Sequence, residues 1–411
     1  MKYTSLLLAF ILFSTVSSAQ IGWFEQHSDG DDILFSIDLL DASTITAVGE
    51  NGLILHTTDG GDTWKEVPSG TSQVLRRVRW HSPSLGVILG NGGFALKSTD
   101  AGQSWTTLNT GVTKSLYDVH FFDADNWMIV GQGAQVLKTD DGGTSFSDEG
   151  TGLNNYNEID IRGDFGIIVG NKGTARRTRN GGEDWGKSTT GVSAELTSVS
   201  IRNDSTAVAV GANGTIIRTT NEGESWEEVY ASIPISQFRL SAVRFLTHDH
   251  AVFAGYGGLV FESYNGGITW TPQESNTDLN IEGLAFIDSK TGNAAGWNRN
   301  IMRTRTGGSL PVTMRPDPLP MHIGLSAPWP NPVSRSAHAA GRVNLQMPSA
   351  GPVAVAVYDL LGRERSSLLS RALQAGTYTL DWNPGSLENG VYLIRLTAQG
   401  KTRVRKFTVI D

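Results

Sequence analysis

Short apolar runs alternate with polar turns along most of the chain, and the turns are rich in glycine, asparagine, aspartate and serine. Within one stretch, residues 75–81 alternate, 85–89 are apolar, and 94–98 and 104–108 are two further short runs. Runs of this length joined by such turns predict β-hairpins. Four antiparallel strands in about forty residues are typical of one blade of a β-propeller.

A turn of the form Ser/Thr-x-Asp/Asn-x-Gly-x-x-Trp/Phe recurs six times. Its aromatic residues are spaced by 41, 41, 39, 41 and 44 positions: Trp64, Trp105, Phe146, Trp185, Trp226 and Trp270. A repeat of this length predicts a propeller or a linear array of repeats.

The acidic or amide residue of each turn has two possible roles. It can accept backbone N–H groups and fasten its own hairpin, or it can serve catalysis or metal binding. Because the residue recurs in the repeats and three of the six are uncharged, we expect the first role for Asp59, Asp100, Asp141, Asn180, Asn221 and Asn265.

Seven glycines end the second strand of successive repeats: Gly49, Gly90, Gly131, Gly170, Gly211, Gly255 and Gly296. The seventh repeat lacks its aromatic residue and its fourth strand. Trp23 precedes Gly49 by 26 residues, as Trp64 precedes Gly90. We therefore predict an all-β, seven-bladed propeller over residues 20–308, in which 23–26 pair with 300–304 and close the ring. Closure leaves no long unpaired edge.

Residues 1–19 read as a signal peptide, with Lys2, an apolar run over 6–13 and small residues at 17–19. A proline-rich linker is expected over 309–324, and regularly spaced short strands over 325–411 suggest an Ig-like β-sandwich.

The chain lacks cysteine, so its stability must come from packing. The net charge of −8 and the acidic body argue against nucleic acid as a partner.

The turn is the signature known as the Asp-box or BNR repeat. The fuller pattern, AVGENGLILHTTDGGDTW from Ala47 and its copies, resembles the photosystem II assembly and stability factor family of seven-bladed propellers. The resemblance covers residues 22–308 and implies a non-enzymatic scaffold that docks a partner protein, though not photosynthesis itself.

That family carries an arginine patch. Five of the seven residues that precede the turn's Ser/Thr are cationic here: Lys97, Lys138, Arg177, Arg218 and Arg303. They can be solvated strand ends or an anion-binding arc. Six arginines that we expect to cluster in neighbouring blades are further candidates for binding: Arg76, Arg77, Arg79, Arg176, Arg177 and Arg179.

The segment 329–333, WPNPV, and the later strings VYDLLGR, LENGVY and KFTV resemble the type A sorting domains of type IX secretion. The resemblance covers 325–411 and implies the secretion machinery as partner, with delivery to the outer-membrane surface or the medium. The motif residues are Pro330, Asn331, Pro332, Asp359, Gly362, Arg363, Gly390 and Tyr392.

On the face formed by the loops between the second and third strands, Tyr256 and Trp297 replace small polar residues. We consider them, with Asn298 and Arg299, as a ligand platform or as blade packing. The unknown ligand is a protein or a glycan.

The alternative function is a sialidase-like or other glycoside hydrolase, which needs paired carboxylates or a Tyr-Glu pair. Glu158 and Asp160 stand out as acidic residues, and their simplest interpretation is an exposed strand face. The Arg-Ile-Pro element of sialidases is missing. We expect no catalytic residue, cofactor or metal, since His248 and His250 alone make a poor metal site.

Overall fold

The computed structural model describes residues 22–27, 29–150, 152–307, 322–334, 341–382, 384 and 387–410, and the backbone of 312–315. The expected signal peptide at 1–19 lies outside these residues, as do 309–311 and 316–321 of the expected linker. No helix in the described ranges is long and apolar enough to cross a membrane.

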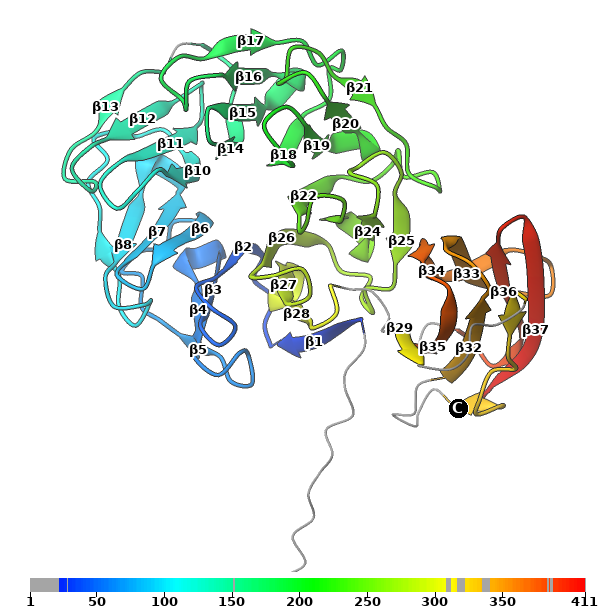
Figure 1. The fold of residues 1–411 in the computed structure, drawn as a ribbon. Helices are drawn as coiled ribbons and strands as arrows, with labels where there is room; N and C mark the ends of the chain where they lie inside the picture. Colours follow the sequence, from blue (N-terminus) through cyan, green and yellow to red (C-terminus); the bar gives the residue numbers. More distant parts are fainter. Residues whose placement is uncertain are drawn as a thin grey trace, which may run out of the picture.

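Seven four-stranded antiparallel sheets form a ring, as Figure 1 shows, and we call the centre of the ring, onto which their innermost strands face, the channel. From the channel outward, the strands of the first four blades are: blade 1, β2 (Leu34–Leu39), β3 (Ile45–Gly49), β4 (Ile54–Thr57) and β5 (Lys65–Glu66); blade 2, β6 (Leu75–Ser82), β7 (Leu85–Gly90), β8 (Ala95–Ser98) and β9 (Thr106–Thr107); blade 3, β10 (Leu116–Phe121), β11 (Trp127–Gly131), β12 (Val136–Thr139) and β13 (Ser147–Asp148); blade 4, β14 (Tyr156–Arg162), β15 (Phe165–Gly170), β16 (Ala175–Thr178) and β17 (Gly186–Ser188).

The remaining blades continue the ring in the same order: blade 5, β18 (Leu196–Ile201), β19 (Ala207–Gly211), β20 (Ile216–Thr219) and β21 (Glu227–Glu228); blade 6, β22 (Leu240–Phe245), β23 (Ala251–Gly255), β24 (Val260–Ser263) and β25 (Thr271–Gln273); blade 7, β26 (Ile281–Phe286), β27 (Gly292–Gly296), β28 (Ile301–Thr304) and β1 (Trp23–His27). Short 3-10 turns follow the second strand in six blades: η1 (Glu50–Gly52), η2 (Asn91–Gly93), η3 (Asn171–Gly173), η4 (Ala212–Gly214), η5 (Tyr256–Gly258) and η6 (Trp297–Arg299).

The predicted closure of the ring is confirmed. Strand β1 pairs antiparallel with β28, with Trp23 opposite Thr304 and His27 opposite Ile301. The side chain of Trp23 is fully buried, and its Nε1 donates to Oε1 of Gln273 at 3.1 Å. The first strand of the chain therefore supplies the fourth strand of the last blade.

A close backbone approach explains the glycine that ends the second strand of every blade. At each of these glycines a Cβ atom would lie 1.8 to 2.6 Å from the carbonyl oxygen of the residue before the innermost strand. In blade 4, Gly170 would meet the carbonyl oxygen of Asn155 at 1.8 Å. Any larger residue would push apart the start of the first strand and the end of the second.

Hydrogen bonds within each Asp-box turn involve its acidic or amide side chain. In blade 1, Oδ1 of Asp59 accepts the backbone N–H of Thr63 at 2.9 Å, and Oγ1 of Thr57 accepts the N–H of Gly61 at 3.0 Å. The equivalent bonds recur in blades 2 to 6. In blade 3 these bonds, led by that from the Ser145 hydroxyl, lower the pKa of Asp141 to about 2. Asp-box side chains that already accept several hydrogen bonds within their own turns are poorly suited to act as metal ligands.

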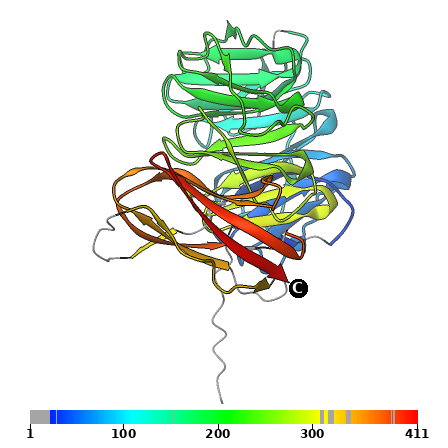
Figure 2. The ribbon, with the colours of Figure 1, turned by 90° about the vertical axis from the view of Figure 1, so that its right-hand side faces the viewer.

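The C-terminal part is a sandwich of two sheets, seen beside the edge-on ring in Figure 2. One sheet has the order β29 (Val312–Arg315), β35 (Gly376–Trp382), β32 (Gly341–Met347) and β30 (Gly324–Leu325); the other has the order β31 (Val333–Ser334), β37 (Lys401–Ile410), β36 (Gly390–Ala398), β33 (Gly351–Tyr358) and β34 (Glu364–Leu373). Trp382 and Phe407 meet edge to face at 5.0 Å in its core.

Part of the expected linker is a strand. Residues 312–315 form β29, which pairs antiparallel with β35 of the sandwich. The prolines at 311 and 316 bound a four-residue run, Val-Thr-Met-Arg, that alternates as an edge strand does. The prolines of this segment therefore favoured the prediction of a linker, although the four residues between two of them have the alternating pattern of a strand.

Candidate functional site

The innermost strands of the seven blades line the channel. Each has a β-bulge after its first residue, for example between Leu75 and Arg77 in blade 2 and between Tyr156 and Glu158 in blade 4. A bulge directs consecutive residues to the same side of a strand. The second, third and fifth residues of these strands therefore form three layers, and the second residues lie at the channel mouth on the side of the η turns.

Oxygens in the two deeper layers hold neighbouring blades together. In blade 4, Oε2 of Glu158 accepts the backbone N–H of Val199 at 3.0 Å, and Oδ2 of Asp160 accepts that of Ile201 at 2.7 Å. The same bond from one blade to the next is made by Ser36, Asp38, Asp118, Ser198 and Ser200.

The interpretation of Glu158 and Asp160 as an exposed strand face is wrong. The Glu158 side chain is only 1% exposed, and Asp160 is half-buried. The polar side of this strand faces the channel and the next blade instead of open solvent. This is because the strand is the innermost of its sheet.

Three arginines and two carboxylates form an ion cluster in the channel, which we call the channel cluster: Arg77, Arg79, Arg244, Asp118 and Glu158. Arg77 and Arg79 each lie 3.1 Å from Asp118, and Arg79 and Arg244 lie 3.0 and 2.9 Å from Glu158. Burial by itself would raise the pKa of Glu158, but the three guanidinium groups outweigh it and hold that pKa at about 2. Glu158 is therefore fixed in its charged form.

The six candidate arginines do not form one patch, which corrects the expectation from sequence. Arg76, Arg77 and Arg79 lie on the innermost strand of blade 2, whereas Arg176 and Arg177 lie on the third strand of blade 4 and Arg179 follows it. The whole of blade 3 separates the two groups. The segment between Arg79 and Arg176 contains all four strands of blade 3, β10 to β13, so the two groups belong to blades that are not adjacent.

Contacts of the blade 4 arginines are local. Nε of Arg176 donates to the hydroxyl of Tyr156 at 3.1 Å, and Arg179 forms ion pairs with Glu222 and Glu224 in the next blade. These contacts join strands and turns around the rim of the ring.

Cations that precede the Asp-box turns also join blades. Nζ of Lys97 donates to the carbonyl of Gly142 at 2.9 Å, and Nε of Arg218 donates to that of Gly266 at 3.0 Å. Arg303 donates to the carbonyl of Gly60 in blade 1. Each of these carbonyls belongs to the Asp-box turn of the following blade, so these three cations act as ties between blades and do not form an open anion-binding arc.

At the channel mouth, Tyr256 and Trp297 lie together where blades 6 and 7 meet. Their rings are edge to face, with centroids 6.1 Å apart, and 37% of Trp297 is exposed. Nε1 of Trp297 donates to Oε1 of Glu282 at 3.0 Å. Burial, together with Glu282, raises the pKa of Tyr256 to about 12, and burial also raises the pKa of Glu282. We call Tyr256, Trp297 and Glu282 the mouth triad.

Arginines around the mouth triad already have partners. Arg239 pairs with Glu195 at 2.5 Å, and Arg76 lies over the ring of Phe35 at 4.9 Å while its Nε donates to Asn91 at 2.9 Å. Arg76 is thus the one candidate arginine of blade 2 that lies in the layer of the triad.

Asn298 adopts the backbone conformation that turn η6 requires, and Arg299 connects blade 7 to blade 1 where the ring closes. Asn298 has a φ of 57°, a left-handed conformation that asparagine tolerates within η6. Arg299 pairs with Asp32 at 2.6 Å and with Glu66 at 2.7 Å, so its guanidinium joins blade 7 to blade 1.

Sequence reasoning missed Glu282. Aligning the second residues of the innermost strands would have found it, because the other six blades have Phe35, Arg76, Tyr117, Asn157, Thr197 and Ser241 there. Glu282 is the one carboxylate in this layer.

One cavity, of about 350 Å³, lies at the channel cluster and is lined by Arg79, His120, Asp160 and Arg244 among others. Burial lowers the pKa of His120 to about 4, so the imidazole there is neutral at pH 7.

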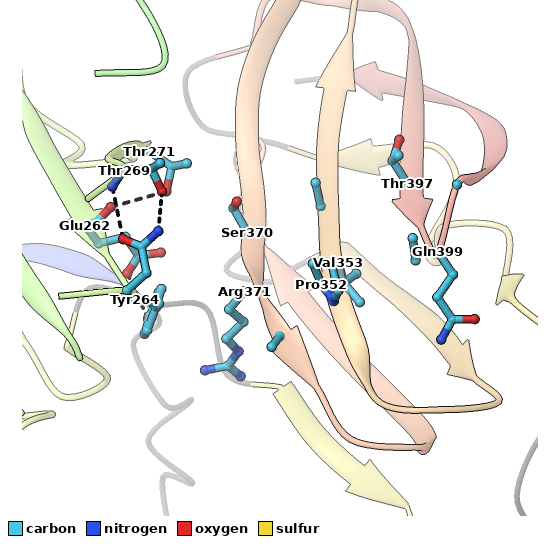
Figure 3. A pocket seen from close by; sticks show the side chains of 15 residues that line it. Glu262, Tyr264, Thr269, Thr271, Pro352, Val353, Ser370, Arg371, Thr397 and Gln399 are labelled. Carbon is cyan, nitrogen blue, oxygen red and sulfur yellow. Dashed lines mark hydrogen bonds between the residues drawn. The ribbon is translucent and has the colours of Figure 1, made fainter. Parts of the chain in front are cut away.

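Another cavity, of about 500 Å³, lies between blade 6 and the sandwich, where β25 runs near β34 (Figure 3). On the propeller side the hydroxyl of Tyr264 donates to Glu262 at 2.9 Å. His250 stacks on Tyr264 at 4.4 Å, while His248 contacts Arg202 and Asp249. The two histidines considered for metal thus have different neighbours.

Comparisons with known proteins agree with this architecture. The sequence model of the family "Photosynthesis system II assembly factor YCF48" matches residues 16–111 and 98–226, which together span more than half of the chain. A second model, "Secretion system C-terminal sorting domain", matches residues 328–410. No curated protein matches the sequence.

Solved structures match the propeller. "YCF48 bound to D1 peptide" has a TM-score of 0.59 at 18% identity, over 70% of this chain and 98% of that one. YCF48 from Cyanidioschyzon merolae gives 0.57 at 18% identity, over 69% and 99%. The WD40 repeats of RRP9 give 0.57 at 12%, over 70% and 99%. At these identities the likeness shows the fold alone. The chain belongs to the photosynthesis system II assembly factor YCF48 family and also carries a secretion system C-terminal sorting domain at residues 328–410.

Proposed function

We propose that the chain is an exported, non-enzymatic binding protein whose propeller holds an extended segment of a partner protein at the channel mouth. The observation that carries the proposal is the mouth triad, where a partly exposed indole and a phenol flank a carboxylate at the end of the channel. Amphipathic aromatic side chains of this kind dominate the energy of protein recognition sites. A solved relative with the same fold is described as bound to a peptide, which supports this class of ligand.

The carboxylates that would serve a glycoside hydrolase have other roles here. Hydrolysis needs one carboxylic acid with a raised pKa and a second group poised across an open cleft. Glu158 has a pKa of about 2 and sits among three arginines. Burial does raise the pKa of Asp160, but both Glu158 and Asp160 accept backbone N–H groups from blade 5. This arrangement favours binding over catalysis.

A paired assay tests the proposal. Purified chain from residue 20 onward is applied to arrays of peptides and of glycans, and incubated with a fluorogenic sialoside. We expect peptides to bind, with binding weakened about tenfold or more by Trp297→Ala, as for a central aromatic of an interface. Tyr230→Ala, which removes another exposed aromatic ring, is the matched control and should bind normally. Sialoside turnover, or binding to glycans alone, would overturn the proposal.

We further propose delivery by type IX secretion to the outer-membrane surface or the medium. The sorting domain at 328–410 supports export toward the outer membrane. Deleting 325–411 is expected to leave the protein in the periplasm while the propeller stays folded, because each part has its own core. Cell fractionation, with circular dichroism of the recovered protein, measures this. Normal secretion of the truncated chain would contradict it.

A further inference from the structure

Glu282 of the mouth triad differs in its partners from three other carboxylates around the channel, and it also differs from Asp38 and Asp160, which accept backbone N–H groups of the next blade. Asp118 and Glu158 are paired with arginines of the channel cluster, and Glu195 is paired with Arg239. Glu282 instead accepts from a neutral donor, Nε1 of Trp297, at 3.0 Å. Among the residues that the structure describes, none lies within the 4.0 Å of an ion pair with Glu282, although the charges of Arg239 and Arg76 act on it from farther away.

Burial makes this arrangement costly. Glu282 is half-buried, and desolvation raises its pKa above the usual range of a glutamate. A carboxylate removed from water is stabilised by a cation at hydrogen-bonding distance. Arg239 and Arg76 lower that pKa through their charge, but neither forms an ion pair with Glu282, because Arg239 is held by Glu195 and Arg76 by Asn91 and the Phe35 ring.

The groups around Glu282 suit a cation on a flexible stem. Aromatic faces attract ammonium and guanidinium groups, most strongly where water is excluded, and their apolar surface covers methylene groups. Tyr256 and Trp297 offer both features beside the carboxylate. The acidic charge of the propeller would also draw cations toward the channel, since the chain has a net charge of −8 while residues 325–411 carry ten basic and five acidic residues.

We propose that the mouth triad binds the side chain of a lysine or arginine in the partner segment, with the cationic head group on Glu282 and the stem against Tyr256 and Trp297. This inference rests on the proposed function, since it specifies which part of a bound segment enters the mouth. It assigns Glu282 as the residue that selects the ligand, whereas the proposed function requires only that the mouth binds peptide.

Five-residue peptides that differ at one position test the inference. The probes are blocked glycine peptides with a central lysine, arginine, glutamine or glutamate, titrated into the full mature chain by calorimetry at low salt. We expect the lysine and arginine peptides to bind at least tenfold more tightly than the glutamine peptide, and the glutamate peptide to bind most weakly. Added salt should weaken the first two peptides more than the third.

Variants of the chain identify the residue responsible. Glu282→Gln keeps the acceptor for Trp297 and is expected to remove the preference for lysine and arginine. Glu228→Gln, on the outer strand of blade 5, is the matched control and should keep it. Thermal unfolding of both variants checks the fold. Equal binding of the lysine and glutamine peptides, or a preference that survives Glu282→Gln, would overturn the cation site while the peptide-binding function stands. Binding of none of the peptides, on the array or in solution, would overturn both.

Discussion

Replacing Trp23 with alanine is expected to lower the free energy of unfolding by about 4 kcal/mol, the range measured for removing a large buried aromatic side chain. The Trp23 side chain is fully buried at the seam of the ring, edge to face with Phe286 at 5.9 Å. Its Nε1 donates to Gln273, and its carbonyl oxygen accepts from Nδ2 of Asn276 at 2.6 Å. The substitution leaves a cavity and removes the donor to the amide oxygen of Gln273 at the same time, while Nε2 of Gln273 keeps Glu262 as its acceptor.

We expect the loss of Trp23 to destabilise the whole ring and not only its surroundings, because the residue lies on the strand that closes the ring. Strands β26, β27 and β28 of blade 7 follow one another in the sequence, whereas the fourth strand, β1, comes from the N-terminal end of the described residues. Strand β1 thus completes the sheet β1-β28-β27-β26. Weakening it exposes the edge of β28, which invites aggregation. Urea denaturation of the purified chain gives the free energy, and Tyr230→Ala, at a side chain that is 76% exposed, should change it by less than about 0.5 kcal/mol. A loss below about 1 kcal/mol for the Trp23 variant would show that the seam does not depend on that residue.

The seven blades and their closure were predictable because the signal is local and repeated. Every blade needs a glycine where its second strand meets the carbonyl before its first strand, and at Gly170 that contact leaves no room for a Cβ atom. The distance of 26 residues from Trp23 to Gly49 then sufficed to place β1. A physical requirement that recurs at fixed spacing can be read from one sequence.

The channel cluster was not predictable in the same way. Arg79 and Glu158 are separated by 79 positions and Arg244 and Glu158 by 86, so each pair joins blades two apart across the channel. Nothing in the local sequence of Glu158 shows that its strand is innermost or that its side chain faces arginines. The bulge that follows the first residue of each inner strand also moves the polar positions out of simple alternation.

Exchanging Glu158 for glutamine is expected to lower the free energy of unfolding by about 3 kcal/mol at pH 7, because Arg244 loses its carboxylate partner and Arg77 and Arg79 keep only Asp118, while all three are at least half-buried. The glutamine keeps an oxygen that can accept the backbone N–H of Val199, which Glu158 binds at 3.0 Å. The loss of stability therefore measures the removed charge and not the loss of this hydrogen bond between blades. Glu149→Gln is the matched control. Its carboxylate pairs with Lys138 at 2.7 Å on the surface and is 46% exposed, so it should cost less than about 1 kcal/mol.

The dependence of this loss on pH follows from the direction of the shift. The pKa of Glu158 in the folded chain, about 2, lies below its ordinary value of 4.5, so its contribution is fully present above about pH 5 and is lost as the pH falls toward 2. Asp38 and Asp160, whose pKa values burial raises, titrate in both proteins and largely cancel in the difference. Urea denaturation at several pH values should therefore show the two proteins converging between pH 5 and pH 2. A gap that stays constant over that range would mean that the glutamine acts through packing, and the arginines would then need no charged partner at this position.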